Sequence, residues 1–571
     1  MVTGLFDHVI VGGGSAGSVL ANRLTADPTR RVLVLESGRP DFSWDVLTRM
    51  PAGVAFVLGR KQYDWCYRTE PEPGLRGRRV DLPSGRLLGG SSNINGMIYQ
   101  RGNPMDYERW AAQPGMEHWT YADVLPYFKR MEDSRSAGPF RARGGPITIS
   151  RGRGDNPLFK AFLQAAVQAG HAATDDVNGF RQEGFAPLDH NIRSSRRWSA
   201  TRAYLDPARE RPNLEVRTGT HTTRIMFDGK RAVGVEYVDG RGQVHHAMGG
   251  EVIVSAGTFR TPQVLQLSGV GDPDLLRSAG IPVVHELPGV GANLHDHTAI
   301  QIQHSCTKPV SLGPTAHLKN APWIGAQWLF LRSGPGASNQ FEVGGFARSN
   351  EELEFPNLMY QFLPLASKSY PNSPTTAHGY QVHVGPMRTD SRGSVRITSP
   401  DWRQAPAIRM NYLSTERDRK EWIEAIRVTR DIMAQPAFAP YDGGEAAPGP
   451  EVRTDEQIWD WVVTNVKSAM HYVGTCRMGV GEGAVVDPDS MRVHGLEGLR
   501  VVDGSVIPEV TNANTYAPVM MVAERAADMI LGRPQLPAEN IAFYRSRPEA
   551  PARLAPVTEP ASMNSSTAGA Q

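Results

Sequence analysis

Short runs of consecutive apolar residues alternate with helix-like spacing at the start of the chain. Residues 9–11 (VIV) form a continuous apolar run, and Ala16, Leu20 and Leu24 follow at the spacing of one helix face. Residues 31–36 (RVLVLE) form a second run, typical of a strand buried on both sides within a parallel sheet. The pattern therefore predicts a strand–helix–strand unit at the N-terminus.

The middle of the first half predicts loops and further strands. The Gly-rich segment 82–97 (LPSGRLLGGSSNINGM) is expected to be a loop that enters a helix. Residues 214–240 alternate apolar and polar positions around two Asp-Gly turns, which favours antiparallel strands. Residues 251–255 (EVIVS) are predicted to form another buried strand, and Thr261-Pro262 to start a helix with proline in its first turn.

The second half of the chain has a different composition and hydrophobic pattern. From about residue 304 to 466, aromatic residues and longer strand-like stretches such as NLMYQFLPL predict a mixed sheet in a second lobe. The segments LRVVDGSVIP and VMMVAERAADMIL then return to the strand-and-helix pattern of the first lobe. From about Leu536 onward Pro, Ala and Ser dominate, so a disordered tail is expected.

Composition excludes several classes of protein. Lys plus Arg number 61 and Asp plus Glu 59, so the net charge of +2 provides no broad basic field for nucleic acid or an anionic bilayer. No stretch reaches the roughly 18 apolar residues of a membrane span. Cys66, Cys306 and Cys476 allow neither a disulfide framework nor a paired metal site. The N-terminal segment does not resemble a signal peptide, so we expect a cytoplasmic protein.

The glycine-rich turn after the first predicted strand points to a bound dinucleotide. Gly12, Gly14 and Gly17 form a G-x-G-x-x-G arrangement, in which backbone amides at a helix N-terminus can face a pyrophosphate. Glu36 ends the next predicted strand about 20 residues further on, where a carboxylate can accept hydrogen bonds from ribose hydroxyls. Together these features predict a dinucleotide-binding site.

The same turn contains a rival motif. Gly13, Ser15 and Gly17 spell G-x-S-x-G, which between a strand and a helix can form the nucleophile elbow of a serine hydrolase. Such an elbow normally follows several strands and a loop that supplies the oxyanion hole, whereas this one opens the chain. A hydrolase using Ser15 is therefore kept as an alternative only.

Several separate segments resemble the glucose-methanol-choline (GMC) family of flavin-dependent oxidoreductases over about residues 5–535. The segments that carry the resemblance are DHVIVGGGSAGSVLANRL, GRLLGGSSNINGMIYQRG, SAGTFRTPQVLQLSGVG, LPGVGANLHDH, HYVGTCRMG, LRVVDGSVIP and NANTYAPVMMVAER. Within the family, SNINGMIYQRGN, DVNGFRQEGF and GASNQFEVGGF are most similar to bacterial choline dehydrogenases. The resemblance implies FAD-dependent oxidation of a primary alcohol, choline-like or uncharged, to the aldehyde.

The resemblance also implies an α/β fold in two domains with the active site between them. A Rossmann-like FAD-binding domain is expected from residues 1–160, 195–305 and 467–535. A substrate domain with a mixed or antiparallel sheet is expected from residues 161–194 and 306–466. Residues 536–571 are expected to be a flexible tail.

Many residues are implied by the resemblance to hold FAD. They are Gly12, Gly14, Ser15, Ala16, Gly17, Glu36, Trp65, Gly90, Asn93, Asn95, Gly96, Met97, Thr222, Asp503, Gly504, Asn514 and Thr515. In some members of the family, a histidine just before the Asn of the Gly-Ser-Ser loop is bonded covalently to the flavin. The matching residue here is Ile94, a hydrocarbon, so we expect non-covalent FAD.

The resemblance places a catalytic pair at His471 and Asn514. An imidazole can accept the hydroxyl proton of a substrate near neutral pH, and an amide can hold the same oxygen by a hydrogen bond. Proton removal eases hydride transfer from the carbon to flavin N5. The reoxidising acceptor, oxygen or a quinone-type compound, and an oligomeric state are left open, as is a flavin-binding protein without turnover.

Three further residues are implied to contact the substrate. Glu342 matches a glutamate that faces the trimethylammonium group in choline-oxidising relatives, which favours a cationic alcohol. Met470 stands where those relatives carry an aromatic residue, and Tyr516 replaces a common Asn or Gln, which favours a bulkier or uncharged alcohol. The segment 295–297 (HDH) carries metal-ligating groups, but adjacent residues seldom point at one ion, so no metal is expected.

Overall fold

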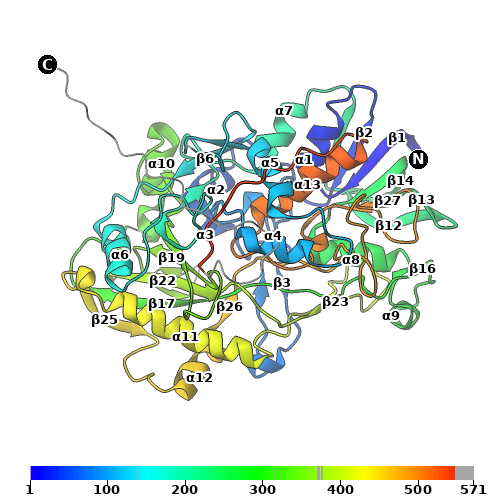
Figure 1. The fold of residues 1–571 in the computed structure, drawn as a ribbon. Coiled ribbons are helices and arrows are strands. Elements are labelled where there is room, and N and C mark those ends of the chain that lie inside the picture. Colours follow the sequence, from blue (N-terminus) through cyan, green and yellow to red (C-terminus); the bar gives the residue numbers. More distant parts are fainter. Residues whose placement is uncertain (1, 137, 316, 370–372, 375–376, 547–571) are drawn as a thin grey trace.

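The computed structural model describes residues 2–136, 138–315, 317–369, 373–374 and 377–546. These residues form two lobes, each centred on one large sheet, and the N-terminal strand lies in the first lobe (Figure 1). The two-lobe α/β architecture predicted from the sequence is confirmed.

The first sheet has parallel strands on one side and antiparallel strands on the other. In order across the sheet, its strands are β11 (Leu214–Thr218), β2 (Val32–Glu36), β1 (Val2–Val11), β14 (Val244–Val254), β13 (Arg231–Val238) and β12 (His221–Asp228), with β27 (Leu499–Val501) paired to β14. Strands β11, β2, β1, β14 and β27 pair in parallel, whereas β12, β13 and β14 pair antiparallel. The central strand β1 is covered on both faces, which explains its continuous apolar run.

The second sheet is antiparallel throughout, which agrees with the antiparallel form of the expected mixed or antiparallel sheet. Its strands, in order, are β25 (Asp442–Ala447), β17 (Thr298–Cys306), β22 (Gly379–Pro386), β19 (Leu358–Leu363), β18 (Val343–Ala347) and β7 (Gly184–Pro187), with β26 (Lys467–Ser468) paired to β17. Because β17 starts at Thr298, the second lobe begins several residues before the expected boundary at 305.

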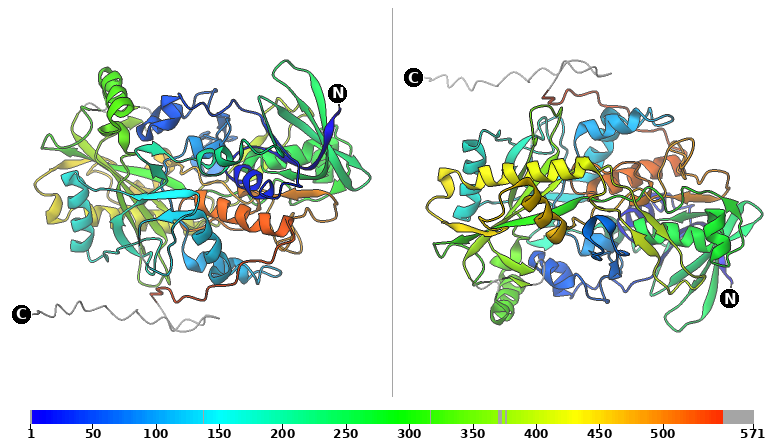
Figure 2. Two further views of the ribbon diagram at one scale, coloured as in Figure 1. Left: turned by 90° about the horizontal axis from the view of Figure 1, so that it is seen from above. Right: turned by 90° about the horizontal axis from the view of Figure 1, so that it is seen from below.

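Helices cover both sheets. The longer ones are α1 (Ser15–Leu24), α4 (Pro104–Ala111), α5 (Tyr121–Met131), α6 (Pro157–Gln168), α8 (Gly257–Leu267), α9 (Pro273–Ser278), α10 (Ala321–Leu331), α11 (Glu416–Met433), α12 (Asp455–Asn465) and α13 (Tyr516–Ile530). Helix α11, yellow in the figures, runs along the second lobe and is seen lengthwise from below (Figure 2). None of the helices in the described ranges is long and apolar enough to cross a membrane.

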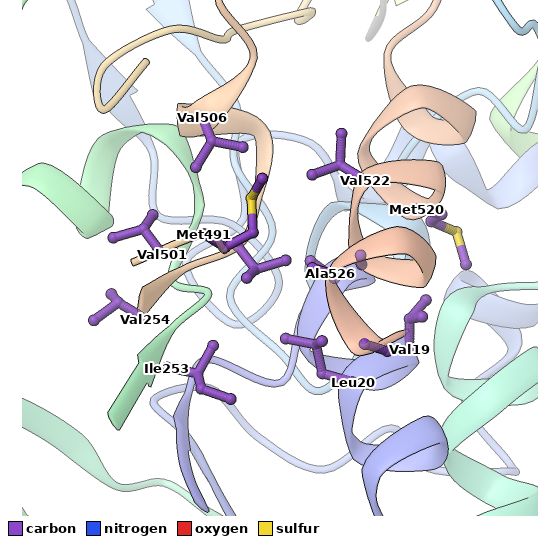
Figure 3. Packing of buried hydrophobic residues seen from close by; sticks show 14 of the residues in the cluster. Val19, Leu20, Ile253, Val254, Met491, Val501, Val506, Met520, Val522 and Ala526 are labelled. Carbon is purple, nitrogen blue, oxygen red and sulfur yellow. The ribbon is translucent and has the colours of Figure 1, made fainter. Parts of the chain in front are cut away.

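The core of the first lobe lies between its sheet and the helix pair α1 and α13. Val19 and Leu20 of α1 lie beside Ala526 of α13, with Ile253 and Val254 of β14 next to them (Figure 3). All five side chains are fully buried, and the small alanine lets the two helices approach closely. This packing fixes where the N-termini of α1 and α13 stand.

Three local predictions are corrected. Helix α8 begins at Gly257, so Pro262 lies inside it; the carbonyl of Thr258, which a proline at 262 cannot bond, accepts a hydrogen bond from Thr475 Oγ1 at 2.6 Å instead. The Gly-rich loop contains only one 3₁₀ turn (Gly90–Asn93), because Gly89 and Gly90 have left-handed backbones.

The third correction concerns the tail. The start of residues 536–546 packs against the first lobe, where the amide of Leu536 donates to the Tyr127 hydroxyl at 3.0 Å and Phe543 is buried. Its end contacts the second lobe, where Arg545 pairs with Glu354. The rest of the expected tail, residues 547–571, lies outside the described residues.

Candidate active site

A cavity of about 280 Å³ is lined by residues of both lobes. The predicted cofactor residues that line it are Gly12, Gly14, Ser15, Ala16, Glu36, Trp65, Gly90, Asn95, Gly96, Met97, Thr222, Asp503, Gly504, Asn514 and Thr515. The predicted pair His471 and Asn514 and the predicted substrate residues Met470 and Tyr516 line it as well. The fold thus gathers segments from opposite ends of the chain around one space.

The glycine-rich turn lines the cavity with backbone atoms that no side chain covers. Gly12 has a φ of +104°, and a Cβ on it would lie 2.4 Å from the carbonyl oxygen of Ser255. A Cβ on Gly14 would meet only the Cα of Gly90, at 3.9 Å, so the amides at the start of α1 stay open to the cavity. Gly17, predicted to contact the cofactor, is instead a packing residue, because its Cβ would lie 2.0 Å from the Gly12 carbonyl oxygen.

Glu36 is the buried carboxylate at the end of β2. Its Oε2 accepts a hydrogen bond from the amide of Gly13 at 2.9 Å, and its Oε1 accepts one from the amide of Gly38 at 2.7 Å. Burial raises its pKa to about 7, although both amides act in the opposite direction. A partner that donates hydroxyl groups to this carboxylate would favour its ionised form.

Trp65 and Arg260 line the cavity, and further cationic and aromatic side chains pack around them. The guanidinium carbons of Arg86 and Arg260 lie 4.7 and 5.2 Å from the ring centroid of Trp65. His221 packs edge-on against Trp65 and bonds Arg260. Burial lowers the pKa of His221 to about 2, so this imidazole is neutral. Arg260 was missed from the sequence, since a helical arginine alone carries no signal.

The Gly-Ser-Ser loop passes along the cavity with an unusual backbone. Met97 has a φ of +60°, and its amide donates to Asn95 Oδ1 at 3.0 Å. The fully buried Arg197, also missed from the sequence, donates to the Asn95 carbonyl at 2.6 Å and to its Oδ1 at 2.7 Å. Asn93 is not among the described residues that line the cavity; its amide holds the loop by donating to the Leu88 carbonyl at 2.8 Å.

His471 and Asn514 meet although they come from different lobes. His471 follows β26 of the second sheet, and Asn514 precedes α13 of the first lobe. Asn514 Nδ2 lies 2.9 Å from His471 Nε2. Burial and the neighbouring His297 hold the pKa of His471 well below its usual range, so the imidazole is neutral and can accept a proton.

The HDH segment braces this pair rather than forming a metal cluster. The His471 amide donates to Asp296 Oδ1 at 2.6 Å, and Ser468 Oγ donates to Asp296 Oδ2 at 2.6 Å. His295 Nε2 accepts from the amide of Val510 at 2.8 Å, on the loop that leads to Asn514. Across the described ranges, no group of three His, Cys, Asp or Glu side chains is arranged to hold a metal ion.

Many of the other residues that line the cavity are apolar or aromatic. They include Ile94, Ile98, Phe341, Ala469, Met470, Tyr472 and Tyr516, together with the polar Gln361. The buried Tyr516 hydroxyl makes no hydrogen bond, and burial raises its pKa. Gln361 Nε2 lies 3.5 Å from Asn514 Oδ1, which orients the Asn514 amide with its nitrogen toward His471.

Glu342 is the one predicted substrate residue that the structure does not place among the described residues lining the cavity. Its neighbour Phe341 does line the cavity. The half-buried Glu342 carboxylate accepts a hydrogen bond from the amide of Gly154 at 2.8 Å, which satisfies it without a cation. The described carboxylates that do line the cavity, Glu36 and Asp503, belong to other parts of it.

Comparisons with known proteins agree with one another. The family model described as GMC oxidoreductase matches residues 6–299 and, for its C-terminal part, residues 389–523. The chain is 54% identical over 546 residues to the oxygen-dependent choline dehydrogenase of Staphylococcus aureus (strain JH9), covering 95% of this chain and 96% of that protein.

Two solved structures are similar over nearly the whole chain. Pyridoxine 4-oxidase from Mesorbium loti gives a TM-score of 0.84 at 32% identity, covering 93% of this chain and 100% of that chain. Formate oxidase gives a TM-score of 0.86 at 26% identity, covering 92% of this chain and 98% of that chain.

Proposed function

Because this chain belongs to the GMC oxidoreductase family, we propose that it oxidises a primary alcohol to the aldehyde with His471 as the base. The predicted enzyme class, an FAD-dependent alcohol oxidoreductase, is confirmed by the family and by the 54% identical relative. The observation that carries the proposal is the neutral, buried His471 beside Asn514 in the cavity.

The residues of the cavity fit FAD. The open amides of α1, the bare backbones of Gly14 and Gly90, and the buried Glu36 carboxylate suit the diphosphate and ribose of its ADP half. Trp65 and its two arginines provide a flat surface for the adenine. When bound, FAD accepts the hydride that leaves the carbinol carbon. Ile94 lines the cavity and carries no group that could form a covalent bond to it.

The chain's own residues prepare the alcohol. We infer that the substrate hydroxyl hydrogen-bonds to both His471 Nε2 and Asn514 Nδ2 and replaces the direct 2.9 Å hydrogen bond between these two atoms. His471 Nε2 removes the hydroxyl proton, while the Asn514 amide donates to the same oxygen and holds it in place. The proton stays on His471 Nε2. The apolar side chains of Met470 and Phe341 limit water around the reacting carbon.

For the substrate, we propose choline or a similar amino alcohol. The support is the 54% identical relative, whose name specifies choline. Because Phe341, Tyr472 and Tyr516 line the cavity and Glu342 is not among its described lining residues, we propose that the cation faces these rings through cation–π contacts. An uncharged primary alcohol is the second candidate, favoured by the apolar lining and because Glu36 and Asp503 are the only carboxylates among the described residues that line the cavity.

Oxygen is the proposed acceptor that reoxidises the enzyme, since the same relative is named as oxygen-dependent. We place the protein in the cytoplasm, and its three free cysteines support a reducing compartment. The hydrolase alternative gains no support, because no hydrogen bond joins Ser15, at the start of α1, to a described histidine that could activate it.

An anaerobic screen of alcohols tests the proposal. Choline should bleach the yellow holoprotein, and admission of air should restore the colour. A holoprotein that no alcohol bleaches would instead be a flavin-binding protein without turnover.

A further inference from the structure

A second buried histidine contacts the proposed base from behind. Nδ1 of His297 lies 2.9 Å from Nδ1 of His471, and the two rings are nearly perpendicular, at 83°. On its other side, Nε2 of His297 lies 3.0 Å from the carbonyl oxygen of Met387. His297 is not among the described residues that line the cavity, so it reaches a substrate only through His471.

The Met387 carbonyl decides which nitrogen of His297 carries the proton. A carbonyl oxygen can only accept, so Nε2 of His297 must be the donor. Burial lowers the pKa of His297 to about 4, so the ring is neutral and its Nδ1 has a free lone pair. The carbonyl itself is fixed, because the Met387 amide donates to the Asn357 carbonyl at 2.7 Å and the residue is buried.

The proton position in His297 then decides the proton position in His471. A lone pair on His297 Nδ1 requires a proton on His471 Nδ1, which leaves His471 Nε2 as the acceptor. The opposite arrangement would turn the lone pair of His297 Nε2 toward the lone pairs of the Met387 carbonyl. At the far end, Asn514 presents its NH₂ group to His471 Nε2 at 2.9 Å, in agreement with this polarity.

We propose that His297 is a positioning residue that fixes the tautomer of His471, so that Nε2 always faces the substrate as a proton acceptor. The inference rests on the proposed role of His471 as base. We call the three successive hydrogen bonds Met387–His297, His297–His471 and His471–Asn514 the relay; each residue in it accepts a hydrogen bond from the next, from the Met387 carbonyl to the Asn514 amide. This role explains the buried position of the His297 side chain, which a metal site or a substrate contact does not explain.

The tautomer can be measured without turnover. In holoprotein labelled with ¹⁵N in its histidine rings, the His471 signals are those missing from His471→Gln. The proposal expects Nδ1 to be protonated and Nε2 unprotonated at neutral pH. A proton on Nε2 of the neutral ring overturns it.

Two variants test whether the relay matters for the reaction. His297→Leu fills the space but removes the acceptor, whereas His297→Asn restores an acceptor oxygen at the place of Nδ1. We expect His297→Leu to slow anaerobic flavin reduction by at least about 10-fold with an unchanged substrate dissociation constant, since a mis-protonated base loses much of its effect. His297→Asn should recover most of the rate.

The outcomes separate the relay from the proposed function. Equal rates in His297→Leu and the parent overturn the relay. A parent that no alcohol bleaches contradicts the proposed function, while the ¹⁵N spectrum still decides the tautomer. If His297→Leu fails to fold or to bind FAD, the ¹⁵N spectrum of the parent decides alone.

Discussion

The amide nitrogen of Asn514 lies 2.9 Å from Nε2 of His471, although 43 residues separate them in the chain. His471 leaves the second sheet after β26, and Asn514 stands before α13, the helix that packs on α1 in the first lobe. The pair therefore depends on two segments, one that leaves the second sheet and one that enters α13, standing side by side. This explains why a base and its partner can be buried and still face one shared cavity.

Replacing the base should separate binding from chemistry. His471→Ala is expected to retain FAD but to slow flavin reduction by the alcohol about 10²-fold or more, the usual scale for losing a positioned general base. Asn514→Ala should slow it by a smaller factor, because the base remains. Stopped-flow bleaching under anaerobic conditions measures both; a His471→Ala protein that bleaches at the parent rate means that the base is another group.

Non-covalent FAD follows from Ile94. Its hydrocarbon side chain lines the cavity and can form no bond to a flavin. Denaturation with acid or heat, followed by filtration, should put the yellow colour in the filtrate. Colour that stays with the precipitated chain would show a covalent link through another residue.

Glu36 should make FAD binding depend on pH. Its pKa is about 7 in the unliganded protein, and ribose hydroxyls that donate to the carboxylate lower it by favouring the charged form. FAD binding then releases a proton, so affinity falls by up to about tenfold per pH unit below 7 and levels off above it. Titration of apoprotein with FAD at several pH values measures this. Glu36→Gln should bind more weakly and without this dependence; a pH-independent parent contradicts the assignment.

Glu342 provides a test of substrate recognition. Because its carboxylate bonds the Gly154 amide, Glu342→Gln should leave the preference for choline over the neutral isostere 3,3-dimethylbutan-1-ol unchanged. Phe341→Leu, at the neighbouring residue that does line the cavity, should reduce that preference by several-fold, the scale of one cation–π contact. The ratio of kcat/KM values for the two alcohols is the measurement. A large loss of the preference for choline in Glu342→Gln would show that the Glu342 carboxylate does recognise the substrate cation.

The hydrophobic pattern predicts those elements of the fold whose burial depends on residues near each other in the sequence. The strand–helix–strand unit is readable because β1 and β2 carry continuous apolar runs, whereas the large apolar residues of α1 recur at helical spacing. The start of α8 was misplaced because Pro262 suggests a first turn, and only the distant Thr475 hydroxyl makes proline acceptable further inside. The antiparallel order of the second sheet depends on pairings between remote strands, which no local window contains.

The same division applies to the site. Motif residues such as Gly12, Glu36 and His471 were found because their neighbours in sequence identify them. The orientation of Glu342 was not, since its partner Gly154 lies 188 residues away. The sequence around His297 gives no signal of its role, because its partners Met387 and His471 are 90 and 174 residues away.

Anaerobic mixing of the yellow holoprotein with choline, followed by its visible absorbance, tests the central claim most directly. The predicted result is full bleaching in the parent, bleaching slowed about 10²-fold or more in His471→Ala, and recovery of the colour when air is admitted. A parent protein that neither choline nor any other primary alcohol bleaches would contradict the assignment of an alcohol oxidoreductase with His471 as its base.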